Sequence, residues 1–219
     1  MTFSVVAVCK RTGQVGVGAV TALQAVGKLA CHAVPNVGAI ASQALLNPYL
    51  AYDGLRLLQR GVDARDTLNR VLACDQRPQN RQVGVVDRQG RTAAWTGSEN
   101  LPWAGHHEGE NYCVQGNRLA GPQVIERMAQ CMETSIDLDL AERLTLALQA
   151  GEEAGGDTEG ERSVNVLVFG AEEYPLCDIR IDDHDDPLRE LQRLYQLYLK
   201  EILPNMAHLP RRSQISEPY

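Results

Sequence analysis

The residue with the clearest chemical potential stands at the start of the chain. Thr2 follows Met1, and because threonine is small, we expect cytosolic processing to remove Met1. The freed Thr2 would carry a hydroxyl and an α-amine, whose reference pKa is about 7.7–8.0. A fraction of that amine is neutral at pH 7 and can take the hydroxyl proton, which a threonine needs in order to act as a nucleophile. The alternative is a frayed terminus without a role, since many proteins begin Met-Thr.

The segments around Thr2 have patterns typical of strands and helices. Short β-branched runs, separated by turn residues, predict strands over 3–9, 15–20, 82–87, 91–96, 111–115, 163–169 and 176–182, with weaker strand candidates over 25–33 and 37–42. Helical spacing predicts helices over 47–61, 63–72, 122–132, 137–153 and 186–203. Runs of strands alternating with runs of helices indicate an α+β fold, with two antiparallel sheets packed face to face and helices on the outer faces.

The chain length and composition limit the possible functions. The 219 residues suit one domain, which we place at 1–203, followed by a tail over 204–219 that contains Pro and Arg. The net charge of −7 predicts no nucleic-acid partner, and no apolar run approaches the roughly 20 residues that span a bilayer. Six scattered cysteines without a CxxC pair indicate reduced, mostly buried thiols. We therefore expect a cytoplasmic protein, and the acidic composition says little about its substrate.

Five sequence blocks in order, covering nearly the whole chain, carry a family resemblance. They are residues 1–20 (MTFSVVAVCKRTGQVGVGAV), 37–61, 81–97, 102–128 and 180–194. With these blocks the chain resembles an uncharacterised bacterial family that is assigned to the N-terminal-nucleophile (Ntn) hydrolases. The resemblance implies the four-layer αββα sandwich of proteasome subunits and their relatives. It also implies hydrolysis of a carbon–nitrogen bond, of the amide type, with Thr2 as the nucleophile and no organic cofactor.

The family fold assigns a role to the segment between the early strands and the first helix. In Ntn-hydrolases this segment lines the nucleophile, and here it comprises Ser42, Gln43, Ala44 and Asn47. Backbone N–H groups of Gln43 or Ala44 could form an oxyanion hole, whereas Ser42 and Asn47 could contact substrate. The simpler interpretation is that Ser42 and Gln43 end a strand and Asn47 caps a helix.

Two further segments are candidates for the same site. Gln115, Gly116 and Asn117 follow a predicted strand, where Gly lets the backbone approach a ligand and the amides can donate or accept. In proteasome-like enzymes a polar loop before a late strand supports the N-terminal amine, and by that analogy Asp157 and Ser163 orient it. A plain turn and a solvated acidic loop are the respective alternatives.

The chain departs from the family at the end of the second predicted strand. The family usually has a Ser-Lys-Phe step there, and this chain has Thr21-Ala22-Leu23. Many Ntn-hydrolases use a buried lysine to tune the nucleophile's proton. Lys28 is a candidate to reach the site from a neighbouring segment. The alternatives are a protein that has lost activity and a family in which the lysine was never catalytic.

Two other classes of function compete with the Ntn reading. A metal-dependent hydrolase could use the acidic run around His184 or the cluster of His106, His107, Glu108 and Glu110, although neither matches a known metal motif. A catalytically inactive Ntn-like protein could bind a ligand or a partner instead. The apolar stripe of the 186–203 helix fits core packing, and it also suits a homodimer contact.

Overall fold

The structure is a computed structural model that describes residues 2–216. The strands in this range are β1 (Thr2–Val8), β2 (Val15–Thr21), β3 (Cys31–Val34), β4 (Gly38–Ala44), β5 (Arg81–Asp87), β6 (Thr92–Thr96), β7 (Gly105–Gly109), β8 (Tyr112–Asn117), β9 (Ser163–Phe169) and β10 (Pro175–Ile181). The α-helices are α1 (Tyr49–Gln59), α2 (Ala64–Ala73), α3 (Pro122–Thr134), α4 (Leu140–Glu153), α5 (Pro187–Leu197) and α6 (Leu203–Met206). Shorter helical segments are η1 (Val26–Lys28), η2 (Pro78–Asn80), η3 (Tyr198–Ile202) and η4 (Arg212–Gln214).

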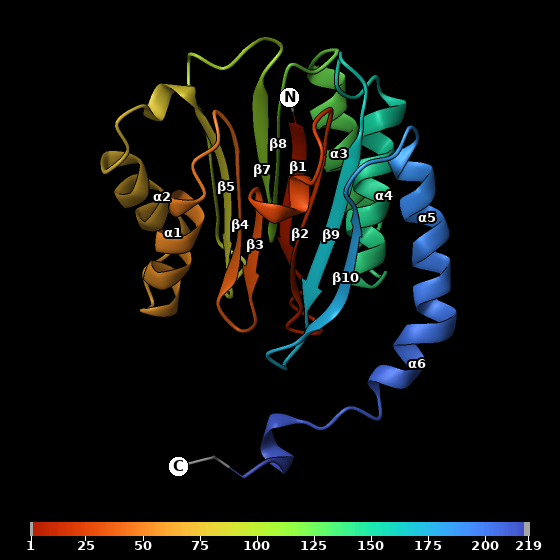
Figure 1. Cartoon of the computed structure of the whole chain (residues 1–219). Helices are drawn as coiled ribbons and strands as arrows, with labels where there is room; N and C mark the ends of the chain where they lie inside the picture. Colours follow the sequence, from red (N-terminus) through yellow and green to blue (C-terminus); the bar gives the residue numbers. More distant parts are fainter. Residues whose placement is uncertain (1, 217–219) are drawn as a thin grey trace.

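The strands form two sheets that lie between helical layers (Figure 1). Over the described residues, sheet A has the order β10-β9-β2-β1-β8-β7 and sheet B the order β3-β4-β5-β6, with every pairing antiparallel. Helices α1 and α2 cover the outer face of sheet B, and α3, α4 and α5 cover the outer face of sheet A. The predicted pair of antiparallel sheets with helices outside is therefore confirmed.

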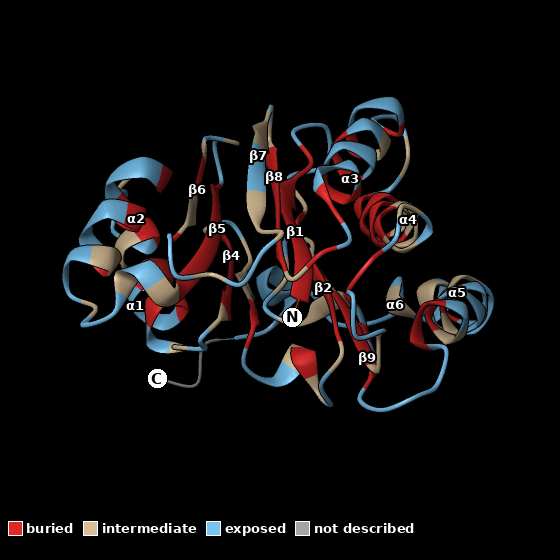
Figure 2. Ribbon diagram, turned by 90° about the horizontal axis from the view of Figure 1, so that it is seen from above, coloured by how far each residue is buried: buried red, intermediate tan, exposed pale blue. Residues whose placement is uncertain are grey.

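Alternation along the strands explains why three apolar layers form. In β1, Phe3 and Val5 pack toward the helices on sheet A, whereas Val6 and Val8 pack between the sheets. The inter-sheet layer contains many small side chains, including Ala19, Ala39, Ala41 and Ala94. These side chains let the sheets approach closely, so the core needs few aromatic residues. Seen from above, the strands form the buried centre of the molecule (Figure 2).

The observed elements differ from the sequence prediction in three places. Residues 25–30 are not a strand, because Ala25 has a left-handed φ of 58° and leads into η1, so β3 begins only at Cys31. Strand β7 was missed because its sequence, GHHEG, lacks apolar alternation and it lies at the edge of sheet A. Strand β8 extends through Asn117, so Gly116 and Asn117 join Gln115 within the sheet and do not form a turn after it.

The C-terminal helix uses its apolar stripe in the core. Leu188, Leu191 and Tyr195 of α5 are buried against sheet A, as the core-packing interpretation predicted. The chain continues through η3 and α6, and the later residues contact the β9–β10 connection, where the backbone N–H of Arg212 donates to Glu172 at 2.9 Å. None of the helices within residues 2–216 combines the length and the apolar character needed to cross a bilayer.

The six cysteines are free thiols, as predicted. Four of them are buried, Cys131 is half-buried and Cys74 is exposed. Burial raises the pKa of Cys31 to about 12, so this thiol stays protonated and behaves as a small apolar side chain.

Candidate functional site

One end of sheet A carries a row of polar residues that begins with the first described residue. Thr2 of β1 pairs with Thr21 of β2 on one side and with Asn117 of β8 on the other, and Thr21 pairs with Ser163 of β9. Residues in register across antiparallel strands share a face. In each strand, a residue one or three positions away from these packs against the helices on sheet A. Because side chains alternate between the two faces of a strand, these four side chains lie on the face that points toward sheet B. Antiparallel pairing therefore collects Thr2, Asn117 and Ser163, three of the predicted site residues, at one place.

Thr2 is held on both its hydroxyl and its carbonyl. Its Oγ1 lies 3.1 Å from Oγ1 of Thr21, and its carbonyl oxygen accepts a hydrogen bond from Nε2 of Gln43 at 3.1 Å. Only 7% of Thr2 is exposed. Two partners from different sheets therefore fix the orientation of this residue.

Gln43 belongs to a buried network of amides and hydroxyls that connects the two sheets. Its Oε1 accepts from Ser4 Oγ at 2.6 Å, and its Nε2 donates to Gln82 Oε1 at 2.9 Å. Asn117 Nδ2 donates to the same Gln82 oxygen at 2.8 Å, and Gln115 Nε2 donates to Ser4 Oγ at 2.6 Å. Buried polar networks of this kind rigidify their surroundings when their hydrogen bonds are made. These hydrogen bonds order the side chains next to Thr2, although Gln115 Oε1 is buried without a hydrogen-bond partner among residues 2–216.

The network requires close contact between the sheets at Gly84 of β5. A Cβ atom at this position would collide with the side-chain amide of Gln115. The absence of a side chain at Gly84 therefore makes room for Gln115 within the inter-sheet layer.

Asp157 lies in the loop between α4 and β9, beside the same end of the sheet. Its backbone bridges to Leu119, two residues after Asn117, and its Oδ1 accepts from the Glu159 N–H at 3.0 Å. The residue is 5% exposed, and its Oδ2 is buried without a hydrogen-bond partner among residues 2–216. Burial raises the pKa of Asp157 to about 6, against the opposing effects of the Ala22 N–H and the Arg118 charge. An unsatisfied buried carboxylate oxygen at this position is suited to accept a donor from a neighbouring group.

The raised pKa of Asp157 predicts how stability depends on pH. At pH values between its ordinary pKa of 3.8 and its folded pKa of about 6, the carboxyl is protonated in the folded state and ionised in the unfolded state. The folded protein then binds more protons, so this residue's contribution to stability falls as the pH rises through that window. Asparagine stays neutral, so Asp157→Asn should not lose stability through this titration. The unfolding free energy of the variant minus that of wild type should therefore increase from about pH 4 to about pH 7.

Urea unfolding at several pH values measures this difference. Glu152, whose pKa burial raises to about 7, is present in both proteins, so its own titration cancels in the comparison. Asp137→Asn, at an exposed position, is the matched control and should show no comparable trend. A difference for Asp157→Asn that does not vary with pH would contradict the prediction.

Two predicted contact residues instead build the start of α1. Ser42 Oγ donates to the carbonyl of Asn47 at 2.9 Å. Asn47 Oδ1 accepts from the Tyr49 N–H at 3.1 Å, and its Nδ2 donates to Asp75 at 2.6 Å. Asn47 therefore contacts the first helical N–H from the position before the N-cap, which is Pro48 and not Asn47 as the sequence predicted. The side-chain hydrogen bonds of Ser42 and Asn47 lead to the start of α1 and to Asp75 after α2, and not to Thr2.

Gln43 and Ala44 differ in how they relate to Thr2. Both lie in β4, where they pair with Gln82 and Arg81 of β5. The contact from Gln43 to Thr2 comes from its side chain, whereas the sequence prediction assigned its backbone N–H. Ala44 has a left-handed φ of 69° where β4 ends, which turns the chain away from the ladder.

Gly116 and Ser163 also have identifiable partners. Gly116 lies opposite Phe3 in the sheet, and its carbonyl accepts from Gln82 Nε2 at 2.7 Å. Ser163 Oγ donates to the Leu23 carbonyl at 2.6 Å and accepts from the Val26 N–H at 3.0 Å. Ser163 therefore lies in the polar row with Thr2, but its hydroxyl binds the loop that follows β2.

Three members of the site were not singled out from the sequence. Thr21 was noted only as a departure from the family pattern, although its hydroxyl contacts that of Thr2. Ser4 and Gln82 lie in strands with mostly apolar neighbours. Polar residues at inward-facing positions of such strands are the signal that could have identified both.

Lys28 does not replace the missing family lysine. It is exposed in η1, and within residues 2–216 its side chain makes no hydrogen bond or ion pair. The groups that contact the Thr2 hydroxyl and carbonyl are instead Thr21 and Gln43.

The acidic run near His184 is engaged in ion pairs and helix capping. Arg162 contacts Asp183 at 2.6 Å and Asp185 at 3.0 Å, and Asp186 accepts from the Arg189 N–H at the start of α5. In the part of the chain that the structure describes, no three His, Cys, Asp or Glu side chains form a group that could hold a metal ion. The metal-dependent alternative therefore gains no support from the geometry.

His106 and Glu108, two members of the predicted His106 cluster, interact with different residues. His106 Nδ1 lies 2.9 Å from Thr96 Oγ1, and Glu108 forms an ion pair with Arg65 at 2.6 Å. Thr96 in turn accepts from Gln82 Nε2 at 2.9 Å, so His106 marks the outer end of the buried network.

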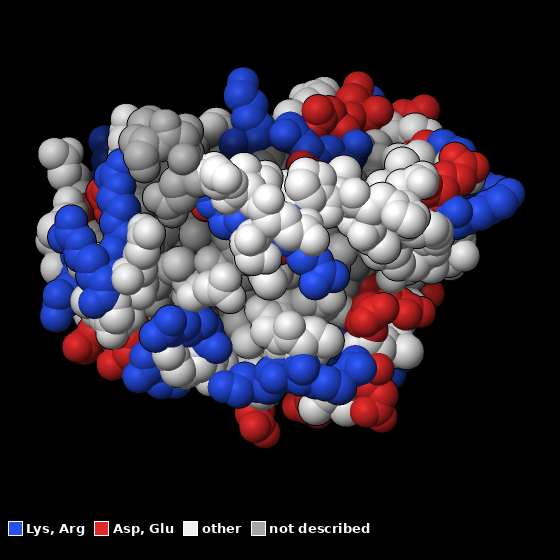
Figure 3. Space-filling view, turned by 90° about the horizontal axis from the view of Figure 1, so that it is seen from below, with Lys and Arg blue, Asp and Glu red and all other residues white. Residues whose placement is uncertain are grey.

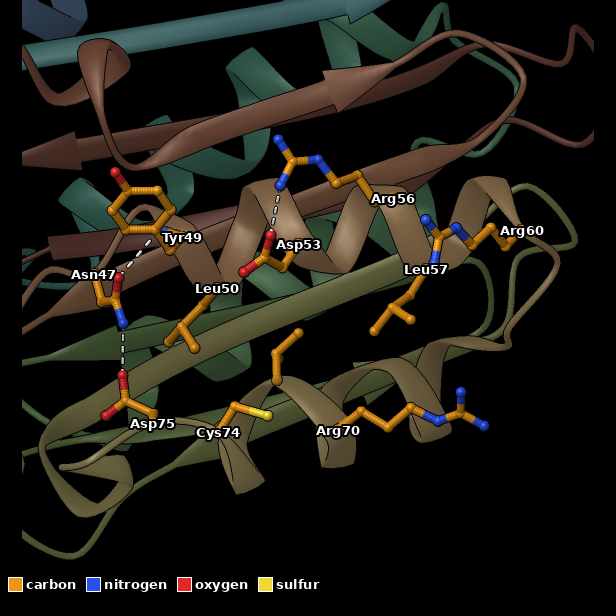
Figure 4. A pocket seen from close by; sticks show the side chains of 11 residues that line it. Asn47, Tyr49, Leu50, Asp53, Arg56, Leu57, Arg60, Arg70, Cys74 and Asp75 are labelled. Carbon is orange, nitrogen blue, oxygen red and sulfur yellow. Dashed lines mark hydrogen bonds and ion pairs between the residues drawn. The ribbon is translucent and has the colours of Figure 1, made fainter.

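A cavity of about 460 Å³ lies away from Thr2, between α1 and α2 on the outer face of sheet B (Figure 4). Asn47 and Asp75 lie at one end of it, and Arg60 and Arg70 lie at the other. Sheet B separates this cavity from the polar row, so it is not part of the Thr2 site.

Comparison with known proteins assigns the chain to a family. Residues 2–191 match a family model described as "Family of unknown function (DUF1028)". The chain belongs to the DUF1028 family. Its sequence is 32% identical to protein SPO2555 from Silicibacter pomeroyi, another DUF1028 protein, whose crystal structure aligns with a TM-score of 0.89 over 100% of this chain and 97% of that one.

A second solved structure aligns less closely with this DUF1028 protein. Anbu (ancestral beta-subunit) from Yersinia bercovieri is 14% identical, with a TM-score of 0.42 over 95% of this chain and 98% of that one. No functionally curated protein matches the chain.

Proposed function

We propose that this DUF1028 protein is an Ntn-type hydrolase that cleaves a carbon–nitrogen bond of the amide type in a small molecule. Thr2, freed by removal of Met1, is the nucleophile. The observation that carries the proposal is the placement of Thr2 at the start of a central strand, with its hydroxyl 3.1 Å from Thr21 and its carbonyl bound by Gln43. The arrangement of two sheets between helical layers is also the one that the family resemblance implies for Ntn-hydrolases.

In the proposed reaction, the Thr2 hydroxyl attacks the substrate carbonyl while the α-amine of Thr2 takes its proton. Collapse of the tetrahedral intermediate breaks the carbon–nitrogen bond, and the proton passes to the leaving amine. Water then attacks the acyl ester, releasing the acid and restoring the hydroxyl. The substrate class is a small amide, and no organic cofactor is needed.

The neighbouring residues have separate tasks in this proposal. Backbone N–H groups at Gln43 and Ala44, together with Asn117, stabilise the oxyanion, and each such donor is typically worth about 2.7–4 kcal/mol of barrier. Asp157 accepts a hydrogen bond from the amine through its unsatisfied Oδ2 and so orients it. Ser163 fixes the loop after β2, on which Ala22 lies close to Asp157.

Intact-mass analysis of the purified full chain, followed by reaction with a β-lactone, tests the proposal. The expected result is a chain that begins at Thr2 and gains one covalent adduct on that residue. Quantitative retention of Met1 would rule out the nucleophile. A chain that begins at Thr2 but forms no adduct would favour an inactive Ntn-like binding protein, for which the low exposure of Thr2 is the supporting observation.

Thr21→Val provides a test of how the Thr2 hydroxyl is activated. Valine keeps the shape of the side chain and removes the hydroxyl that lies 3.1 Å from Thr2 Oγ1. If Thr21 helps to orient or transfer the Thr2 proton, the β-lactone reaction should slow by about 10²-fold, the lower end of what positioned proton transfer contributes. The rate is measured from adduct mass against time, with Thr134→Val on the exposed surface of α3 as the control. Equal rates for the two variants would remove Thr21 from the mechanism.

A further inference from the structure

The cavity between α1 and α2 has the size and the lining of a small-molecule site. Its volume is about 460 Å³, within the range of about 300–1,000 Å³ that such sites occupy. Leu50 and Val71 form a buried apolar floor, and Leu57 adds to it from α1. Helices α1 and α2 form its two walls, and Asn47 and Asp75 add to its lining from the segments next to these helices (Figure 4).

Two arginines at one end of this cavity lack acidic partners. Arg60 lies at the end of α1 and Arg70 lies in α2, and Figure 4 shows both at the same end of the cavity, near Leu57. Neither guanidinium makes an ion pair or a hydrogen bond within residues 2–216. Arg56, in contrast, is paired with Asp53 at 2.7 Å. Arg60 and Arg70 thus retain donor groups that suit a carboxylate or a phosphate.

The opposite end of the cavity is closed by groups that are already satisfied. Asp75 accepts from Asn47 at 2.6 Å and pairs with Arg81 at 3.0 Å, so its charge is compensated. The free charge in the cavity is therefore positive and confined to one end. Figure 3 shows that basic side chains also gather on the side of the molecule that carries α1 and α2, although the chain has a net charge of −7. This distribution favours the approach of an anion.

We propose that the α1–α2 cavity binds a small amphiphilic anion. A carboxylate or phosphate head group lies between Arg60 and Arg70, and a short apolar chain lies over Leu50, Leu57 and Val71. The charged guanidinium groups donate strong hydrogen bonds to the anionic head group, and the apolar floor removes the ligand's alkyl chain from water. Because sheet B separates this cavity from Thr2, the proposal does not depend on the chemistry of Thr2.

Calorimetric titration of the full-length protein with three probes tests the proposal. Hexanoate and hexyl phosphate supply the two possible head groups on the same chain, and hexanol supplies the chain without the charge. Saturable binding of at least one anion, with no measurable binding of hexanol, is the expected result, and the preferred anion identifies the head group. Binding of hexanol as tight as that of the anions, or no binding of any probe at millimolar concentration, would overturn the proposal.

Arginine variants locate the site. The double variant Arg60→Gln/Arg70→Gln should weaken binding of the preferred anion at least tenfold. Arg88→Gln removes a charge that is also exposed, from the β5–β6 turn, and should leave binding unchanged. Equal losses in both proteins would show a nonspecific effect of charge. A wild-type dimer in sedimentation that the double variant abolishes would instead assign the arginines to contact between two copies of the chain, and would overturn the proposal.

Discussion

Thr2→Ala is expected to abolish the β-lactone adduct and any amidase turnover, with a rate loss of about 10⁴-fold or more, as for removal of other catalytic nucleophiles. Alanine is also small, so Met1 should still be removed, and the variant tests the hydroxyl separately from processing. Thr2 contributes no apolar packing comparable to that of Phe3, so we expect the fold to be retained. The measurements are adduct mass, hydrolysis of a small amide panel, and circular dichroism.

Thr2→Ser is the matched control for this prediction. Serine keeps the hydroxyl and the α-amine, and it loses only the methyl group. It should therefore retain a substantial part of the wild-type reactivity, whereas Thr2→Ala should have none. If both variants hydrolyse the amide panel at the wild-type rate, the activity belongs to other residues. If wild-type protein has a free Thr2 and neither reacts nor hydrolyses, the protein is a binding module with an Ntn-like arrangement.

The elements that the sequence predicted well are those with local signals. Asp63 accepts from the Asp66 N–H at 2.9 Å and Asn47 accepts from the Tyr49 N–H, so side chains two or three residues away mark where α1 and α2 begin. The β1–β2 and β5–β6 hairpins follow from turn residues between β-branched runs. The alternation of strand runs with helix runs predicted two antiparallel sheets between helices, which the structure bears out, and the family resemblance implied the same layers.

The parts of the site that were missed depend on contacts between distant segments. Gln43 and Gln82 reach the Thr2 end only because β4 and β5 lie in sheet B, opposite β1 and β8 in sheet A. Neither residue has a local pattern that indicates this position. For Gln43 the structure shows a side-chain contact with Thr2, whereas the prediction concerned its backbone N–H group, because residue type alone does not indicate which group makes a contact. The contact of Thr21 with Thr2 likewise depends on the pairing of β1 with β2, which places the two residues opposite each other.

Edge strands and loop conformations were the other source of error. GHHEG forms β7 because β8 offers a free edge, and not because its residues favour a strand. The clustering of His106, His107 and Glu108 in sequence suggested a metal site. Their separate partners, Thr96 and Arg65, became visible only after β7 was placed in the sheet.

Gln82→Ala is expected to lower the unfolding free energy by about 3 kcal/mol, the upper end of the usual range for single substitutions, because it breaks a buried hydrogen-bond network. Gln82 is 0% exposed, and its Nε2 donates to the carbonyls of Gly116 and Gly105 at 2.7 and 3.1 Å. Its Oε1 accepts from Gln43 and Asn117. Truncation removes one partner from each of these groups, and a buried group that is left unsatisfied costs about 1–3 kcal/mol.

The same variant should also weaken the chemistry proposed for Thr2, because Gln43 and Asn117 lose a shared anchor on either side of that residue. Urea unfolding measures the loss of stability, and the β-lactone reaction at a temperature where the variant is folded measures the loss of reactivity. Gln123→Ala, at an exposed position of α3, should change stability by no more than about 0.5 kcal/mol. A loss below about 1 kcal/mol for Gln82→Ala would mean that water replaces the amide between the sheets. In that case, the inter-sheet network could not be what holds Thr2 in place.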